Sequence, residues 1–185
     1  AQWNASQLGM VVHGFVLAGG ESSRFGENKA RHVIAGRPMA SRVAQRMSDA
    51  GLEVALLVRD RELEDLGWPL WVEPSSPVSY PLRSVLWALE QIPPEETALF
   101  VPCDLPFLEV ADLLLLREAT APTVAWDGTN LQPLLLHLGK DQSTALRETV
   151  RQSGSATGFV KGFKRLRLDA PNLRNINRPE DLDSV

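Results

Sequence analysis

The sequence has only one cysteine, no excess of positive charge and no long hydrophobic run. Cys103 is the only cysteine among 185 residues, which excludes an internal disulfide and fits a reducing compartment, so we expect a cytoplasmic protein. No apolar run approaches the roughly 20 residues of a membrane span. With 19 basic against 23 acidic residues and a net charge of -4, general nucleic-acid binding is disfavoured. We therefore expect neither a membrane nor a nucleic-acid partner.

Residues 1–10 have neither the basic segment nor the apolar core of a secretory signal. We expect them to be an N-terminal extension without regular structure. Residues 11–185 are close to the length of one ordinary domain and long enough to bury a sizeable core.

Apolar runs alternate with amphipathic stretches along the chain. The runs predict strands, and the amphipathic stretches predict helices, with a last helical turn at Pro179–Asp183. This alternation indicates an α/β fold: a single-domain, Rossmann-like three-layer sandwich with a mostly parallel central sheet. The expected strands are Val11–Ala18, Val54–Val58, Leu70–Val72, Ala98–Val101, Thr123–Trp126, Leu131–Leu136 and Lys164–Leu168, and the expected helices are Pro38–Ala50, Leu82–Ile92, Val110–Ala119 and Gln142–Arg151.

A glycine-containing loop, GGESSRFGENK, follows the first expected strand. Gly19 and Gly20 would let backbone N–H groups approach an anion that a side chain would keep away. Ser22 adds a hydroxyl donor, while Arg24 and Lys29 add two cations suited to phosphate. The loop therefore indicates a nucleotide triphosphate site. The alternative is a tight turn with two solvated basic residues.

A second polar cluster, PCDLPF, follows the strand expected at Ala98–Val101. Ligands of open parallel sheets bind beyond the carboxyl ends of the strands, so Asp104 should emerge beside the glycine loop. Its carboxylate is a hard oxygen ligand of the kind that Mg²⁺ prefers. Pro102 and Pro106 restrict the backbone on either side. Neither the P-loop nor the dinucleotide-binding glycine pattern is present in the chain.

Four segments together resemble one family. LAGGESSRFGENK resembles the signature of nucleotidyltransferases with a GT-A-like fold, and PCDLPF resembles their metal-binding segment. LQPLLL resembles their substrate-side strand, and NINRPEDL is similar to the ending of the molybdenum cofactor guanylyltransferases of the MobA type. The resemblance spans nearly the whole chain, in order, so residues 11–185 are expected to form the nucleotidyltransferase domain.

The resemblance implies transfer of GMP from GTP to the phosphate of Mo-molybdopterin, with release of pyrophosphate. It implies contact with molybdoenzymes or other proteins of cofactor biosynthesis, and Mg²⁺ held by Asp104. It assigns catalysis to Arg24, Lys29 and Asp104, the pterin side to Asn175 and Asn177, and nucleotide binding to Leu17, Ala18, Gly19, Gly20, Ser22, Lys29 and Asp104. An ionised phosphate is the attacking group, so the site needs no general base.

The chain departs from the family pattern on the nucleoside side. Arg59 lies where the family commonly has an Asn, and Glu73 lies in a segment that usually has an Asp. Arg83-Ser84 lie where two small residues, Ala-Gly, are common. A cytidylyltransferase of the same pathway, a transferase acting on another phosphorylated small molecule, and a nucleotide-binding paralogue without catalysis are the alternatives.

Several chemically capable residues are interpreted as structural. His13, His32 and His137 lie among apolar residues without a metal-binding spacing, and Cys103 reads as a buried thiol rather than a nucleophile. The basic run Lys161–Arg167 is interpreted as a solvated face, with an anion or acidic-partner clamp as the alternative.

Overall fold

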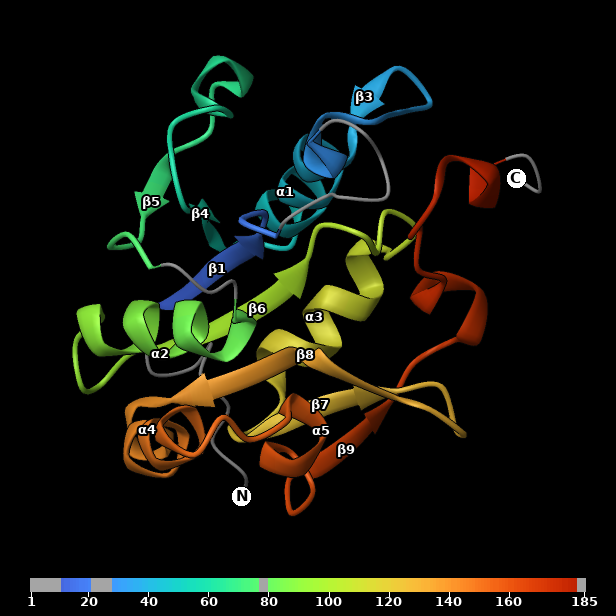
Figure 1. Ribbon diagram of the computed structural model, residues 1–185. Coiled ribbons are helices and arrows are strands. Elements are labelled where there is room, and N and C mark those ends of the chain that lie inside the picture. Colours follow the sequence, from blue (N-terminus) through green and yellow to red (C-terminus); the bar gives the residue numbers. More distant parts are fainter. Residues whose placement is uncertain (1–10, 21–27, 77–79, 183–185) are drawn as a thin grey trace.

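The computed structural model describes residues 11–20, 28–76 and 80–182. They form a seven-stranded sheet in the order β5-β4-β1-β6-β8-β7-β9 (Figure 1). Each neighbouring pair is parallel except the two pairs that β8 makes, with β6 and with β7. The strands are β1 (Val12–Leu17), β4 (Glu53–Val58), β5 (Leu70–Val72), β6 (Thr97–Pro102), β7 (Thr123–Trp126), β8 (Leu131–Gly139) and β9 (Lys164–Arg167).

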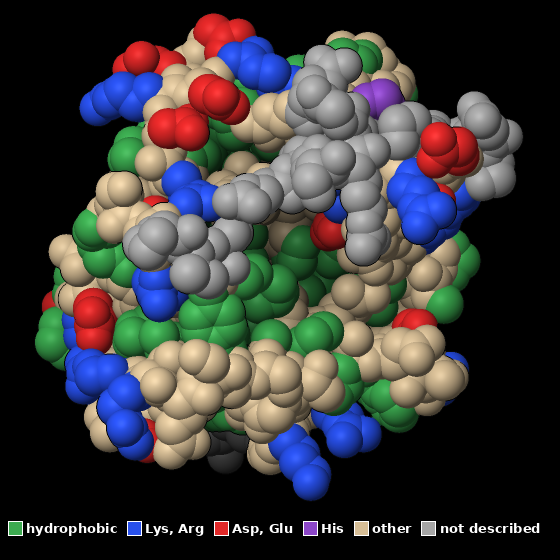
Figure 2. Space-filling model, in the orientation of Figure 1, with side chains coloured by type: hydrophobic (Ala, Val, Ile, Leu, Met, Phe, Trp, Pro, Cys, Tyr) green, Lys and Arg blue, Asp and Glu red, His purple; other side chains and the backbone are tan. Residues whose placement is uncertain are grey.

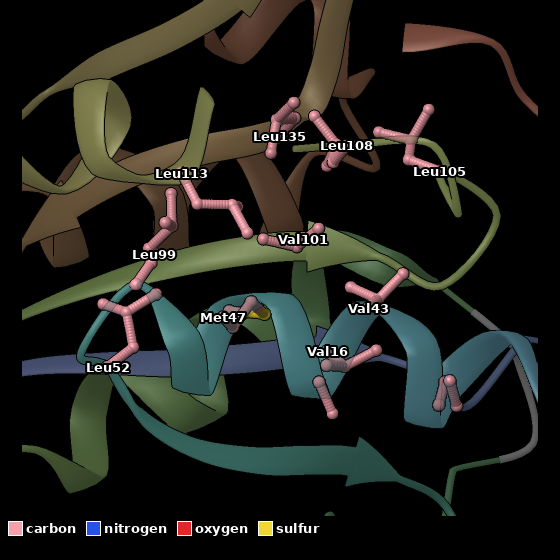
Figure 3. Close-up of a cluster of buried hydrophobic side chains, with 14 of the residues drawn as sticks. Val16, Val43, Met47, Leu52, Leu99, Val101, Leu105, Leu108, Leu113 and Leu135 are labelled. Atoms are coloured by element: carbon pink, nitrogen blue, oxygen red, sulfur yellow. The ribbon is translucent and has the colours of Figure 1, made fainter. Parts of the chain in front are cut away.

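Helices cover both faces of this sheet. On one face, α1 (Met39–Asp49) and α3 (Val110–Glu118) bury Val43, Met47 and Leu113 against the strands, as Figure 3 shows. On the other, α2 (Pro81–Gln91), α4 (Ser143–Arg151) and α5 (Ala156–Phe159) pack over a second cluster. These layers confirm the three-layer α/β sandwich with a mostly parallel sheet.

A glycine brings the first strand and the first helix close together. A Cβ added at Gly14 would lie 2.8 Å from Met47 Cε and 3.1 Å from Leu52 Cβ, so a larger residue would push α1 off β1. The helix ends where expected, because Gly51 follows it in the left-handed region with φ +76°.

The structure differs from the sequence prediction in local details. A small hairpin of β2 (Val33–Ile34) and β3 (Arg37–Pro38) precedes α1, with Ala35 and Gly36 both at positive φ, as two-residue hairpin turns require. Strand β8 runs on to Gly139 because β6 pairs with it along that stretch.

Short 3₁₀ helices fill several connections, and one of them carries the predicted last turn. They are η2 (Lys29–Arg31), η3 (Glu64–Leu66), η4 (Lys140–Gln142), η5 (Ala170–Leu173) and η6 (Pro179–Leu182). Among the described helices, none is long and apolar enough to cross a membrane. The extension predicted at residues 1–10 lies outside the described ranges.

Candidate active site

The ends of β1 and β6 bring the two predicted clusters side by side. Leu17 pairs with Pro102, and Cys103 N–H donates to Leu17 O at 3.2 Å. A pocket of about 210 Å³ opens there, and Figure 2 shows it as a hollow with hydrophobic walls. Its lining includes six of the predicted site residues: Leu17, Ala18, Gly19, Gly20, Lys29 and Asp104.

Lys29 and Asp104 form an ion pair inside this pocket. Lys29 Nζ lies 3.0 Å from Asp104 Oδ2, and the two side chains are only 17% and 20% exposed. The first turn of η2 places Lys29, because Asn28 Oδ1 accepts from Ala30 N–H at 3.1 Å and Ala30 is buried. Asp104 emerges at the same sheet edge as Gly19 and Gly20, as the sequence predicts, and its ion pair with Lys29 is a finding of the structure.

Asn28 was missed by the sequence reasoning. It lines the pocket, and its Nδ2 also donates to Glu62 Oε2 at 3.0 Å. Asparagine directly before a helical turn is a typical N-cap, and this was the available signal.

The two asparagines near the C-terminus have different partners. Asn177 Oδ1 accepts from Lys29 Nζ at 3.0 Å, so Asn177 lies at the cationic end of the site. Asn175 Oδ1 instead accepts from Gln132 Nε2 of β8 at 3.2 Å. Their predicted place beside a pterin stays a prediction, but the contact between Asn177 and Lys29 could not be expected from the sequence.

Asp104 has the chemistry of a metal ligand. Its Oδ1 is buried and has no hydrogen-bond partner in the described part of the chain. A buried carboxylate oxygen without a donor is costly unless a cation satisfies it. No group of three or more His, Cys, Asp or Glu gathers among the described residues, so Asp104 stands at this sheet edge without a second carboxylate, histidine or thiol grouped around it there.

The two glycines of the loop serve different purposes. A Cβ at Gly19 would lie 3.1 Å from Arg59 Cγ and 3.4 Å from Arg59 N, whereas one at Gly20 would meet nothing within 4 Å. The missing side chain of Gly19 therefore lets the chain pack closely against the end of β4, which the sequence did not predict. Ala18 N–H donates to Leu57 O at 3.1 Å, so this N–H group is already used in pairing with β4.

Two of the residues that depart from the family pattern, Arg59 and Arg83, both contact Ser76. Arg59 Nη2 donates to Ser76 O at 2.6 Å, and Arg83 Nη1 donates to Ser76 Oγ. Arg59 and Arg83 thereby connect the end of β4 and the start of α2 to the loop after β5. Ser84, beside Arg83, lines the pocket.

The residues interpreted as structural are explained by their surroundings. Burial raises the pKa of the Cys103 thiol to about 12, helped by the negative charge of Asp104, so the thiolate needed for nucleophilic attack does not form near neutrality. His137 lies 2% exposed between Leu116 O and Thr97 Oγ1. Ser22 and Arg24 lie outside the described residues.

Comparison with known proteins gives a consistent answer. The model of the MobA-like NTP transferase domain matches residues 14–167. A probable molybdenum cofactor guanylyltransferase of Deinococcus radiodurans is 32% identical over 181 residues, covering 90% of each chain. A molybdenum cofactor guanylyltransferase of Cereibacter sphaeroides is 27% identical, covering 94% of each.

A solved structure has the same fold. The molybdopterin-guanine dinucleotide biosynthesis protein A of Archaeoglobus fulgidus superposes with a TM-score of 0.71 at 18% identity, covering 93% of this chain and 95% of its own. The family match spans most of the chain, including the glycine loop and Asp104. The chain therefore belongs to the MobA-like NTP transferase domain family, whose members are nucleotidyltransferases.

Proposed function

We propose that this protein transfers GMP from GTP to the phosphate of Mo-molybdopterin and releases pyrophosphate. The observation that carries the proposal is the Lys29–Asp104 pair in the pocket beside Gly19 and Gly20. The names of the relatives in Deinococcus and Cereibacter support the choice of substrates. A cytoplasmic location and contacts with acceptor molybdoenzymes belong to the same proposal.

The chain's own groups act by positioning and charge. Gly19 and Gly20 offer backbone N–H groups to the phosphates. Lys29 contributes its ammonium, which besides Asp104 also contacts Asn177. Arg24 is proposed to act on the same phosphates. The acceptor's phosphate oxygen attacks the α-phosphorus of GTP, and the bond to pyrophosphate breaks with its electrons on the leaving oxygen. Because the attacking oxygen is already anionic, no proton must be removed.

Asp104 is proposed to hold Mg²⁺ through its buried Oδ1. The metal would neutralise charge on the phosphates, and phosphate oxygens and water would supply its other ligands. Because Lys29 contacts the other oxygen, Oδ2, a bound nucleotide phosphate would compete with this carboxylate for the ammonium.

The test is a turnover assay with labelled GTP, Mg²⁺ and molybdopterin. Formation of the guanine dinucleotide and pyrophosphate is the expected result. GTP binding without any transfer would make the protein a nucleotide-binding paralogue and overturn the proposal.

The base preference needs a separate experiment, because Arg59 and Arg83 depart from the family pattern. Competition calorimetry with GTP, CTP, ATP and UTP should give the tightest binding for GTP. Tighter CTP binding would place the protein with the cytidylyltransferases while keeping the site assignment intact.

A further inference from the structure

The segment from Arg174 to Asp181 is anchored on the active site, although it lies after residue 167, where the family match ends. Ile176 is fully buried with Ile34 and Met39, and Phe107 packs against them. Ile176 N–H donates to Asp104 O at 2.9 Å, so this segment is bonded to the backbone of the proposed metal ligand. The next residue, Asn177, contacts Lys29.

One carboxylate holds the backbone at Asn177. An oxygen of Asp181, Oδ2, accepts from Asn177 N–H at 2.7 Å and from Arg178 N–H at 2.9 Å. The backbone of Asp181 is held in turn, since Arg174 Nη2 donates to Asp181 O and the Arg174 guanidinium lies over the Phe107 ring. Asn177 is thus held from both sides, by Ile176 and by Asp181.

We propose that Asp181 is a positioning residue, which keeps Asn177 Oδ1 on Lys29 Nζ. The proposal rests on the proposed function in one respect, namely that Lys29 acts on the phosphates. An amide oxygen is neutral, so Asn177 can fix the ammonium without cancelling its charge, whereas Asp104 cancels it. When Asp104 binds a metal cation instead of Lys29, Asn177 continues to hold the Lys29 side chain in place.

The competing explanation is that Asp181 only stabilises the turn that begins η6. The chain offers a matched control for it. Asp127, in the turn between β7 and β8, likewise accepts from two backbone N–H groups, those of Thr129 at 2.7 Å and Asn130 at 2.6 Å. Asp127 belongs to no part of the proposed machinery, so its loss should affect only its own turn.

The experiment is a double-mutant cycle. Asp181→Ala and Asn177→Ala should each lower kcat/KM for GTP by about tenfold, the usual cost of one charge-assisted hydrogen bond. The double variant should be no worse than either, because both lose the same contact. Asp127→Ala should keep normal kcat/KM. Independent, multiplying losses for Asp181→Ala and Asn177→Ala would overturn the proposal.

A second measurement does not depend on the reaction. The side-chain amide signals of Asn177, assigned by their loss in Asn177→Ala, should shift in the NMR spectrum of nucleotide-free Asp181→Ala but not in that of Asp127→Ala. Unchanged signals in Asp181→Ala would refute the positioning role. If the wild type transfers no GMP, the proposed function fails while these spectra still decide the role of Asp181.

A third variant guards against misfolding. If Asp181→Ala does not fold, Asp181→Asn keeps an acceptor oxygen at the same place. It should retain the Asn177 signals close to their wild-type positions and most of the activity. The proposal would also fail if Asp181→Asn lost as much kcat/KM as Asn177→Ala while the Asn177 amide signals stayed at their wild-type positions.

Discussion

At the scale of single residues, the site depends on two opposite charges that neutralise each other. Lys29 and Asp104 are both mostly withdrawn from water, and each is the other's counter-charge at 3.0 Å. Such a pair adds little stability beyond the desolvation cost of its two charges. Its chemical use is therefore the better reason for having it there, since a nucleotide and a cation can each replace one partner.

Asp104→Asn tests the metal ligand. The amide keeps the shape and can still accept from Lys29, so the melting temperature should change little. Turnover should fall by about a hundredfold or more, comparable to the loss of one strong electrostatic stabiliser. Steady-state kinetics and thermal melts of the purified variant check this. A folded variant with nearly normal Mg²⁺-dependent transfer would mean that the metal site lies elsewhere.

Lys29→Ala tests the phosphate contact. It removes a charge-assisted hydrogen bond, which should weaken binding of nucleotide triphosphate by roughly ten- to a hundredfold. Calorimetry with GTP and Mg²⁺ measures the effect. Lys161→Ala is the control, because Lys161 is exposed and no ion pair of it is found in the described part of the chain. Equal affinity in both variants would remove Lys29 from the site.

The neighbouring glycines give opposite expectations. Gly19→Ala should destabilise the fold by about 1–3 kcal/mol, because its Cβ presses on Arg59. Gly20→Ala should leave stability nearly unchanged, because its Cβ points into open space, yet weaken GTP binding by obstructing the backbone. Urea unfolding and calorimetry on both variants separate the two effects. Equal stability losses would show that the two positions are equivalent.

At the scale of secondary-structure elements, His137 joins three of them. From β8, its Nε2 contacts Thr97 Oγ1 of β6 at 2.8 Å, and its Nδ1 contacts Leu116 O of α3 at 3.0 Å. Burial lowers the pKa of His137 below its ordinary value, so the folded protein holds the neutral ring. The histidine therefore connects the sheet to a helix.

The lowered pKa makes stability depend on pH. Below the unfolded pKa of about 6.5, the unfolded chain binds a proton that the folded protein does not, so stability falls as pH decreases from there toward the lower folded pKa. The slope from one such group is at most about 1.4 kcal/mol per pH unit. Urea unfolding at pH 7.5 and 5.5 should show this loss in the wild type and less of it in His137→Gln. Identical losses of stability in the two proteins would mean that titratable groups other than His137 cause the change between pH 7.5 and 5.5.

At the scale of the whole molecule, distant parts of the chain meet at one edge of the sheet. Lys29 comes from near the start, Asp104 from the middle and Asn177 from the end, and the folded chain brings both of the latter onto Lys29. A nucleotide bound there stabilises only the folded state.

Saturation with GTP and Mg²⁺ should therefore raise the unfolding free energy, by about 2.7 kcal/mol at a ligand concentration of a hundred times Kd. Lys29→Ala should lose about half of this gain or more at the same GTP concentration, because its Kd is expected to rise by roughly ten- to a hundredfold. Thermal melts with and without ligand measure it. An equal shift in both proteins would indicate that the nucleotide binds away from Lys29.

Much of this protein followed from the sequence alone. Alternation of apolar runs and amphipathic stretches predicted the α/β sandwich, because burial on both faces of a parallel sheet requires continuous apolar strands. Strand ends marked the site, so Asp104 could be placed at the same sheet edge as the glycine loop before any coordinates. These signals are local, because each of the two clusters begins directly after its own apolar strand.

Only the tertiary structure decided the rest. The contact of Asn177 with Lys29 and the packing of Gly19 against Arg59 join residues far apart in the chain. Arg59 and Arg83, which flank Ser76 in the sequence, likewise meet on it only in the folded chain. No local pattern encodes such pairs, because they depend on strand order and on how helices and loops pack over the sheet. Those arrangements minimise the free energy of the whole molecule rather than of any one segment.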